Sequence, residues 1–179
     1  MVIKIAGAGL AGLTAAINLA KAGKEVEVFE VNRNCGYRFH GDIQGIENWS
    51  YEEDALIHLQ RMNIKLNFSY HPTDSFQITN RKQSIIIKPK RPVFYLVKRG
   101  PYPDTLDTSL KKQAVAAGVS IHFNTKIKEE QADVIATGPI GKRAWGIDKG
   151  IVFKTNLSNR AEMLLGDDMS YKGYAYLLV

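Results

Sequence analysis

The chain has 179 residues, of which 45% are hydrophobic; it holds 24 Lys and Arg against 18 Asp and Glu, for a formal net charge of +6. A chain of this length and composition can bury a core without disulfides, which excludes an intrinsically disordered protein. The single cysteine, Cys35, excludes an internal disulfide and a paired-thiol redox centre. It fits a reducing, cytoplasmic compartment.

The first segments predict a strand, a helix and a second strand. Val2 to Ala6 is rich in β-branched residues, and Leu13 to Ala22 places its apolar residues at helical spacing. Gly23 then ends the helix as a C′ glycine, and Lys24 to Glu30 alternates as a strand. Together they predict a strand, helix, strand (βαβ) unit of about 30 residues.

The middle of the chain is less regular. Asn32 to Ser50 lacks a clear period and predicts a structured loop, whereas Tyr51 to Met62 predicts a helix capped by Ser50 with Glu53 completing a capping box. Ile64 to Val97 predicts an antiparallel β meander that includes strands at Ser84 to Lys88 and Val93 to Val97.

The second half returns to alternating helix and strand. Asp104 to Gly118 predicts a helix capped by Asp104 or Thr105, followed by buried strands at Val119 to Phe123 and Ala132 to Ala136. Strands are also expected at Ile151 to Thr155 and Tyr171 to Val179. The fold class is therefore α/β, a Rossmann-type parallel sheet with an inserted antiparallel β meander. We expect a discontinuous nucleotide-binding domain at 1–63 and 99–150, and a strand-rich, substrate-side portion at 64–98 and 151–179.

Basic residues gather in one segment of the insertion. Arg81 to Arg99 contains Arg81, Lys82, Lys88, Lys90, Arg91, Lys98 and Arg99 and no acidic residue. Either this is the solvated face of a hairpin, or it is a surface for anionic head groups or an anionic substrate, which would allow peripheral membrane contact. No nucleic-acid motif accompanies the charge. No run of about 18 apolar residues is present, so no transmembrane segment is expected.

A glycine-rich turn carries the strongest functional signal. Gly7, Gly9 and Gly12 form G-x-G-x-x-G directly between a strand and a helix, and Glu30 ends the next strand 18 residues after Gly12. Such a turn brings backbone N–H groups and the helix N-terminus to a pyrophosphate. A carboxylate at the position of Glu30 accepts the ribose hydroxyls and repels the extra phosphate of NADP.

Longer segments of the sequence favour FAD over NAD as the cofactor. The segment IAGAGLAGLTAAINLAKAGKEVEVFE resembles the FAD fingerprint of glutathione-reductase-type flavoproteins, and ADVIATGP, residues 132–139, resembles their second short motif. Arg99 to Gly118 resembles a segment of geranylgeranyl-reductase-like and aromatic-hydroxylase-like flavoproteins, and GYRFHGDIQGIENW resembles a loop of archaeal-type geranylgeranyl reductases. The resemblance implies an FAD-dependent oxidoreductase.

The resemblance also implies roles for single residues. The pyrophosphate would lie on the turn formed by Gly7, Ala8, Gly9, Leu10, Ala11 and Gly12, and the adenosine ribose on Glu30 and Val31. The backbone of Lys126 and Ile127 would pass the adenine, and Ala136, Thr137 and Gly138 form the second motif. Arg38 and Arg99 would hold the phosphate or ribityl region; the alternative for both is a surface or ion-pair role.

One departure from that family concerns completeness. The third family motif, a Gly-Asp followed by small residues, is missing, since Gly166-Asp167-Asp168 lacks the small residues and predicts a turn. The chain also ends on an apolar strand. We therefore expect a fragment, a split gene product, or a subunit whose partner supplies the missing segment.

The sequence assigns no catalytic acid or base. His40 is a candidate proton donor because its loop could approach the flavin, although an ordinary exposed histidine is the simpler interpretation. Cys35 predicts an inert small hydrophobic residue, and the histidines are not spaced as metal ligands. The leading hypothesis is FAD-dependent reduction of an isoprenoid-like or other apolar substrate. The alternatives are an NAD-dependent dehydrogenase and a non-catalytic nucleotide-binding subunit.

Overall fold

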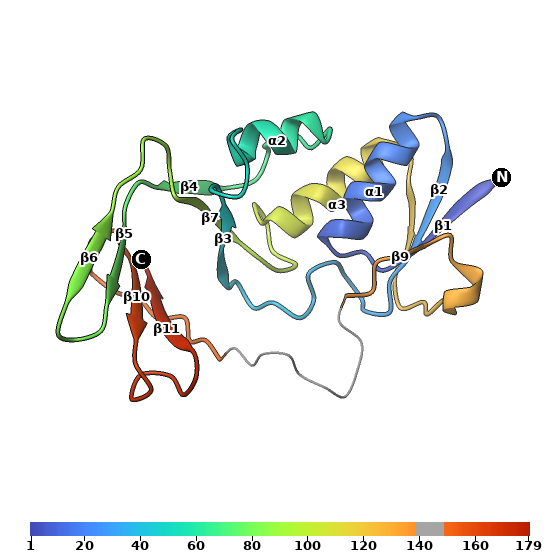
Figure 1. Ribbon diagram of the computed structural model, residues 1–179. Coiled ribbons are helices and arrows are strands. Elements are labelled where there is room, and N and C mark those ends of the chain that lie inside the picture. The colour runs from blue at the N-terminus through green and yellow to red at the C-terminus, as the bar shows by residue number, and fades with distance from the viewer. Residues whose placement is uncertain (139–148) are drawn as a thin grey trace. The chain divides into compact units, whose positions relative to one another are not determined.

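The computed structural model describes residues 1–138 and 149–179 (Figure 1). The chain forms two compact units. The first comprises Met1–Asp42, Leu56–Ser69 and Lys98–Ile151, and the second comprises Ile43–Ala55, Tyr70–Val97 and Val152–Val179. The predicted domain boundaries differ from these at residues 43–55, which lie in the second unit, and at residues 64–69, which lie in the first.

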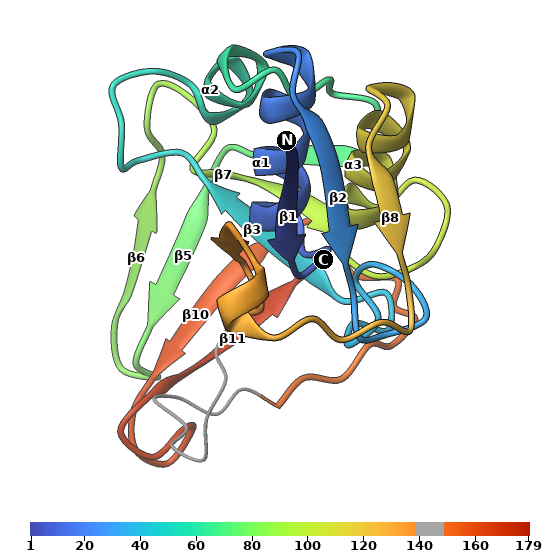
Figure 2. The ribbon, with the colours of Figure 1, turned by 90° about the vertical axis from the view of Figure 1, so that its right-hand side faces the viewer.

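A parallel sheet forms the centre of the first unit. Its strands are β1 (Val2–Ala6), β2 (Glu25–Phe29), β8 (Ser120–His122) and β9 (Val134–Ile135), in the order β8-β2-β1-β9. β1 pairs in parallel with β2 and β9, and β2 pairs in parallel with β8. Figure 2 shows β1, β2 and β8 running in one direction in front of helices α1 and α3. The predicted Rossmann-type fold class is confirmed.

Two helices cover this sheet, α1 (Leu10–Lys21) and α3 (Leu106–Ala116). Leu13, Ala16 and Ile17 form the buried face of α1 and are at most 1% exposed, as is Ile5 of β1. This face is the one that the helical spacing predicted. Gly23, at φ 75°, follows the end of α1, and the Thr105 hydroxyl caps α3 by accepting the Thr108 N–H at 3.2 Å.

The region between the units departs from the prediction. The expected loop 32–50 contains strand β3 (Ile43–Glu47), and helix α2 runs only from Ala55 to Arg61. Ser50 is not its cap, because the Ser50 hydroxyl donates to the Glu47 carboxylate at 2.6 Å. Asn48 takes that place, since its side-chain oxygen accepts the Ala55 N–H at 2.7 Å. The sequence pattern had placed the cap two residues too late and the helix four residues too early.

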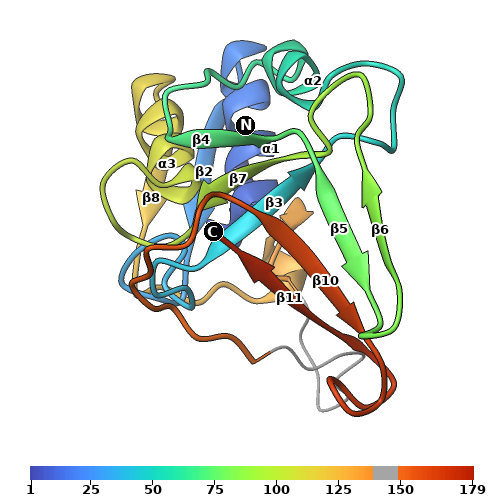
Figure 3. The same ribbon diagram turned by 90° about the vertical axis from the view of Figure 1, so that its left-hand side faces the viewer.

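The second unit holds two sheets (Figure 3). One has the order β3-β7-β4, with β7 at Phe94–Lys98 and β4 at Tyr70–Thr73. The other has the order β11-β10-β5-β6, with β5 at Phe76–Thr79, β6 at Ser84–Ile87, β10 at Ala161–Leu165 and β11 at Tyr174–Leu178. The pairs β4·β7, β5·β6 and β10·β11 are antiparallel, and β10·β5 is parallel. The inserted strands are thus antiparallel in pairs, but they divide between two sheets instead of following one another in a single meander.

Other C-terminal predictions had mixed outcomes. Residues 151–155 are not a strand, and β10, which the sequence did not predict, supplies that part of the sheet. Exposure explains the miss, since Ile151, Val152 and Phe153 are 82, 70 and 53% exposed. Residues 167–169 form the predicted turn. No helix in the described ranges is long and apolar enough to cross a membrane.

The basic segment, residues 81–99, begins in the turn between β5 and β6 and includes the exposed strand β6. Every residue from 81 to 90 is exposed, and Arg81 forms an ion pair with Asp168 at 2.7 Å within the second unit. An anionic partner for this surface stays a prediction.

Candidate functional site

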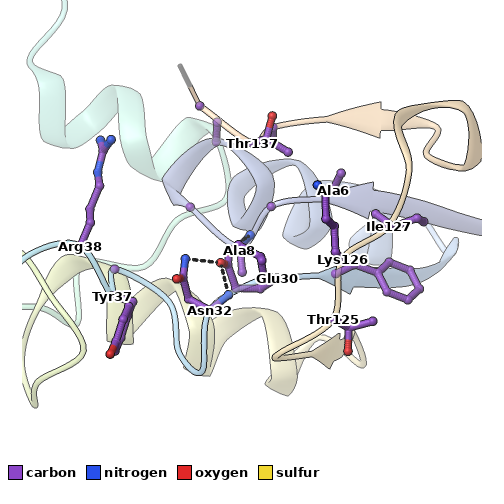
Figure 4. A pocket seen from close by; sticks show the side chains of 18 of the residues that line it. Ala6, Ala8, Glu30, Asn32, Tyr37, Arg38, Thr125, Lys126, Ile127 and Thr137 are labelled. Carbon is purple, nitrogen blue, oxygen red and sulfur yellow. Dashed lines mark hydrogen bonds between the residues drawn. The ribbon is translucent and has the colours of Figure 1, made fainter. Parts of the chain in front are cut away.

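A cavity of about 1150 Å³ lies in the first unit, at the carboxyl edge of its parallel sheet (Figure 4). Each strand contributes the residues that directly follow it: the turn after β1, the loop after β2, the segment 125–130 after β8, and residues 136–138 after β9. Open parallel sheets bind ligands at this edge, because there the chain turns away from the sheet and leaves backbone groups free.

The three glycines of the turn, Gly7, Gly9 and Gly12, have different surroundings. Gly7 has φ 103°, and a Cβ there would lie 2.4 Å from the Ala136 carbonyl oxygen. A Cβ on Gly12 would lie 2.0 Å from the Gly7 carbonyl oxygen. Gly9 is different, because a Cβ there would meet no protein atom within 4 Å. Gly7 and Gly12 therefore close the turn against the protein, whereas Gly9 keeps its outer side open.

The start of α1 faces this open side without a side-chain cap. Gly9 is the N-cap residue, no side chain bonds to the first turn, and that turn contains no acidic residue. Leu10 and Ala11 line the cavity. The first N–H groups of a helix have no partner within the helix and carry partial positive charge, so this end of α1 favours an anion.

Glu30 is a buried carboxylate at the end of β2, with 8% of the residue exposed. One carboxylate oxygen, Oε2, accepts the Ala8 N–H at 2.9 Å. The other, Oε1, accepts the Asn32 backbone N–H at 2.8 Å and the Asn32 side-chain N–H at 2.7 Å, as Figure 4 shows. These bonds join the glycine turn to the loop after β2 through a single negatively charged side chain.

Backbone hydrogen bonds hold the later segments in place. Thr125 donates its N–H to the Glu30 carbonyl at 2.9 Å, and Asn124 donates to the Asn32 carbonyl at 3.1 Å. Ala136 donates to the Ala6 carbonyl at 2.8 Å. Lys126, Ile127 and residues 136–138 therefore reach the cavity from backbone that is fixed to β1 and to the end of β2.

Arg99 lines the cavity but is held by a buried acid. Its guanidinium forms two hydrogen bonds with Asp107, at 2.8 and 3.0 Å, and Asp107 also accepts the Gly100 N–H at 2.9 Å. The side chains of Arg99 and Asp107 are 11% and 1% exposed. Phe39 lies under Arg99, with its ring centre 4.2 Å from the guanidinium carbon. Of the two roles expected for Arg99, the ion pair is the one present; contact with a phosphate or ribityl group stays a prediction.

Arg38 and Cys35 belong to the same loop. The Arg38 guanidinium carbon lies 4.7 Å from the centre of the Phe39 ring. The ion pairs found among the described residues do not include Arg38. Cys35 is 1% exposed, and its thiol donates to the Asp107 carbonyl at 3.4 Å. Burial raises the pKa of the Cys35 thiol to about 11, as expected for an inert residue.

The structure gathers most of the predicted site around one cavity. Every predicted cofactor-binding residue lines it except Gly12, which packs against Gly7 beneath the turn. His40 is exposed and is not part of the lining. No group of three or more metal-ligating side chains occurs in the parts of the chain that the structure describes. Pro139, the last residue of the second motif, lies outside the described residues.

Sequence reasoning missed several lining residues, namely Ala6, Phe29, Asn32, Asn34, Gly36, Tyr37, Phe39, Asp107, Thr125, Lys128, Glu129 and Glu130. Two of them had a usable signal. Asn32 follows Glu30 by two residues, where its amide can reach the carboxylate, and Asp107 is an acid on the face of α3 that also carries Leu106 and Leu110. A buried acid needs a partner, and Arg99 precedes it by eight residues.

Comparisons with known proteins agree with the fold. Residues 5–55 match the family described as NAD(P)-binding Rossmann-like domain. The comparison with curated proteins gives no match. One similar solved structure is 2-methyl-3-hydroxypyridine-5-carboxylic acid oxygenase, mutant C294A, with 26% identity and a TM-score of 0.50; the match covers 69% of this chain and 31% of the oxygenase.

Two further structures share the fold at lower identity. PqsL of P. aeruginosa in complex with 2-aminobenzoylacetate has a TM-score of 0.55 and 14% identity, covering 72% of this chain and 34% of PqsL. A flavoprotein/dehydrogenase from Cytophaga hutchinsonii has a TM-score of 0.51 and 15% identity, covering 72% and 31%. The chain therefore spans about a third of the length of these proteins, and its first unit has the Rossmann-like nucleotide-binding fold.

Proposed function

We propose that this chain is the FAD-binding part of a flavin-dependent oxidoreductase. The observation that carries the proposal is the cavity itself. It brings an uncapped helix N-terminus, the open side of Gly9 and the carboxylate of Glu30 together at the carboxyl edge of a parallel sheet. An anion-binding turn beside a ribose-binding carboxylate is the arrangement that a dinucleotide requires.

The residues present fit FAD. The cavity, at about 1150 Å³, is slightly larger than the roughly 300–1,000 Å³ usual for small-molecule sites, which suits a ligand of this length. The turn from Gly7 to Ala11 would hold the pyrophosphate, Glu30 and Val31 the ribose, and Lys126 and Ile127 the adenine. When bound, the flavin supplies the hydride or electron transfer, and the protein binds and orients it.

We prefer FAD to NAD because of the residues that line the cavity in addition to the glycine turn and Glu30. Residues 136–138, which resemble the second flavoprotein motif, line the cavity, and Ala136 and Thr137 lie against Gly7; Arg38 and Arg99 line the cavity as well. Glu30 also disfavours NADP, because a 2′-phosphate would meet a buried carboxylate. The oxygenase that is 26% identical to this chain is an oxidoreductase by name, which supports the reaction class.

The substrate class rests on the sequence resemblance alone. The geranylgeranyl-reductase-like stretches support reduction of an isoprenoid-like or other apolar substrate, with the second unit on the substrate side. The basic residues 81–91 would then suit a lipid phosphate. A cytoplasmic location and a second subunit or further segment that completes the flavin end belong to the same proposal.

Two other functions make different predictions. An NAD-dependent dehydrogenase would purify colourless and bind NAD more tightly than FAD. A non-catalytic nucleotide-binding subunit would bind FAD without passing electrons to any acceptor.

The visible spectrum of the purified chain, before and after addition of FAD, tests the proposal. Heat release and identification of the nucleotide then establish which cofactor was bound. Bound FAD is the expected result, and reduction by a chemical donor followed by reoxidation with a candidate acceptor tells an enzyme from a binding subunit. Failure to take up FAD, with binding of NAD instead, would overturn the proposal.

Gly9→Asp is the sharpest variant for this test. Asp is a favourable N-cap, so the helix should remain folded, but its carboxylate would bond to the first N–H groups of α1 and repel a pyrophosphate. Gly150→Asp is the matched control, because it introduces the same charge at a glycine where a Cβ also meets no atom within 4 Å and which does not line the cavity. We expect loss of FAD from the first variant and retention in the control.

A further inference from the structure

The Glu30 carboxylate is more heavily hydrogen-bonded than ribose binding by itself explains. It accepts the Ala8 N–H on Oε2, and both the backbone and the side-chain N–H of Asn32 on Oε1. An ionised carboxylate offers about four acceptor positions. Three are thus filled by the protein, and the position that remains is on Oε2.

The side-chain bond from Asn32 has a different character from the other two. The Ala8 and Asn32 backbone bonds follow from the path of the chain, which the glycine turn and the bond from Asn124 to the Asn32 carbonyl hold independently. The Asn32 side chain is not needed for that path, since Asn32 lines the cavity and is exposed. Its side-chain amide donates a hydrogen bond to Glu30 Oε1, and the distance of 2.7 Å is in the range of strong, charge-assisted hydrogen bonds.

We propose that Asn32 is a positioning residue that determines selectivity for the ribose. By occupying Oε1, its amide fixes the rotamer of Glu30 and presents Oε2 to a ribose hydroxyl. This inference rests on the proposed nucleotide site, and it assigns to Asn32 the recognition of a ribose with free hydroxyls over one without them. Without the amide, Glu30 keeps its charge but loses part of its orientation.

The test compares two ligands on the whole chain, freed of any bound nucleotide. Titration calorimetry measures the affinity of ADP and of 2′,3′-dideoxy-ADP, which differ only in the ribose hydroxyls. We expect the wild type to prefer ADP and Asn32→Ala to lose at least about fivefold of that preference, because the hydrogen bond that it removes is one of the stronger kind made to a carboxylate. Glu30→Gln should lose the preference too, and adding Asn32→Ala to it should cost no more, because the amide acts through the carboxylate.

Asn34→Ala is the matched control. It removes the same side chain from the same loop and the same cavity lining, but Asn34 bonds to the Cys35 N–H and to Lys111 and not to Glu30. Its ratio of ADP to dideoxy-ADP affinity should equal that of the wild type. Asn32→Ser, which retains a short hydroxyl donor, should recover part of the preference.

The outcomes separate this inference from the proposed function. If the wild type binds neither ADP nor FAD, the nucleotide site itself is wrong. If the wild type binds ADP but Asn32→Ala weakens both ligands equally, or leaves the ratio unchanged, then Asn32 has only a structural role and the inference is overturned.

Discussion

The two units of this chain bury their strands to very different degrees. In the first unit, Ile5 and Val28 at the centre of the parallel sheet are 0% exposed, and two helices cover that sheet. In the second unit, the edge strand β6 is exposed along its whole length, with Ile85, Ile86 and Ile87 at 66, 60 and 42%. Its core cluster consists of Phe94, Leu96 and Ala161 with partly buried neighbours.

The difference indicates where this chain's own residues can build a site. A cavity with fixed walls needs backbone that is held on both sides, and the first unit provides it because each lining segment continues directly from a strand of the buried sheet. Exposed strands have few contacts to fix them, so local opening costs less free energy there. The candidate nucleotide site therefore lies in the first unit, and both nucleotide binding there and substrate recognition by the second unit remain proposals.

Breaking the glycine turn should have the largest effect on the first unit. A Cβ on Gly12 would lie 2.0 Å from the Gly7 carbonyl, so Gly12→Ala must separate α1 from the turn, and we expect at least about 3 kcal/mol of destabilisation. Gly9→Ala is the matched variant, because its Cβ meets no protein atom within 4 Å. It should lower the melting temperature much less than Gly12→Ala, because its only structural cost is a poorer N-cap, and it should weaken FAD binding. Thermal unfolding followed by circular dichroism measures the melting temperature of each variant, and titration with FAD measures its binding. Equal melting temperatures for the two variants would contradict this account of the turn.

Removing the buried acid of the site should have the next largest effect. Asp107→Ala removes the buried carboxylate that accepts two hydrogen bonds from the largely buried Arg99 and one from the Gly100 N–H, and we expect a loss of about 3–5 kcal/mol in urea unfolding. Asp104→Ala, next to the cap of the same helix, is the control and should cost much less, because Asp104 is exposed. A loss no larger than that of the control would mean that the ion pair does not hold this wall of the cavity.

An alkaline titration compares one ionisable group from each unit. Burial raises the pKa of Cys35 from its ordinary 9.0 to about 11. Burial, followed by the hydrogen bond to Asp54, raises the pKa of Tyr95 from 10.0 to about 12. Both groups lose their protons more easily in the unfolded chain, so their contribution to stability should be constant below pH 9 and should be lost as the pH rises from 9 to 12.

Single variants assign this fall to the two units. Cys35→Ala should reduce the fall between pH 9 and 11, and Tyr95→Phe should reduce the fall between pH 10 and 12. Denaturant unfolding at several pH values measures the difference from the wild type at each pH, which removes the cost that each variant has at neutral pH. A variant whose curve runs parallel to that of the wild type would show that its group does not contribute.

The smallest effect is expected at the exposed edge of the second unit. Ile86→Thr replaces a side chain that is 60% exposed with another β-branched one, so stability should change by at most about 0.5 kcal/mol. Hydrogen exchange should agree, with amides of β6 exchanging much faster than those of β1 and β2. Strong protection of β6 in this chain would indicate that the edge is covered and would remove the contrast between the two units.

The elements that could be predicted are those whose pattern is local. From Val2 to Lys21, the apolar residues follow a regular period, and the glycines restrict the turn to a narrow range of backbone conformations. The cap of α3 could likewise be narrowed to Asp104 or Thr105 from adjacent residues, and Thr105 is the one that forms it. The start of α2 was missed because its cap, Asn48, lies seven residues before the helix and reaches it across a bend. Strand β10 was missed because its partners, β5 and β11, lie on either side of it in the sheet and far from one another in sequence.

By itself, the sequence determined the Rossmann-type unit and placed Gly7, Gly9 and Glu30 at its candidate site, because the steric limits on a glycine turn and the spacing from that turn to the end of the next strand act over short stretches of chain. Only the tertiary structure decided that Asp107 holds Arg99, that Asn32 and Ala8 occupy three acceptor positions of Glu30, and that the inserted strands divide between two sheets. These features depend on which distant groups meet once the chain is folded, and a buried charge or an unpaired strand accepts any suitable partner that the packing brings to it.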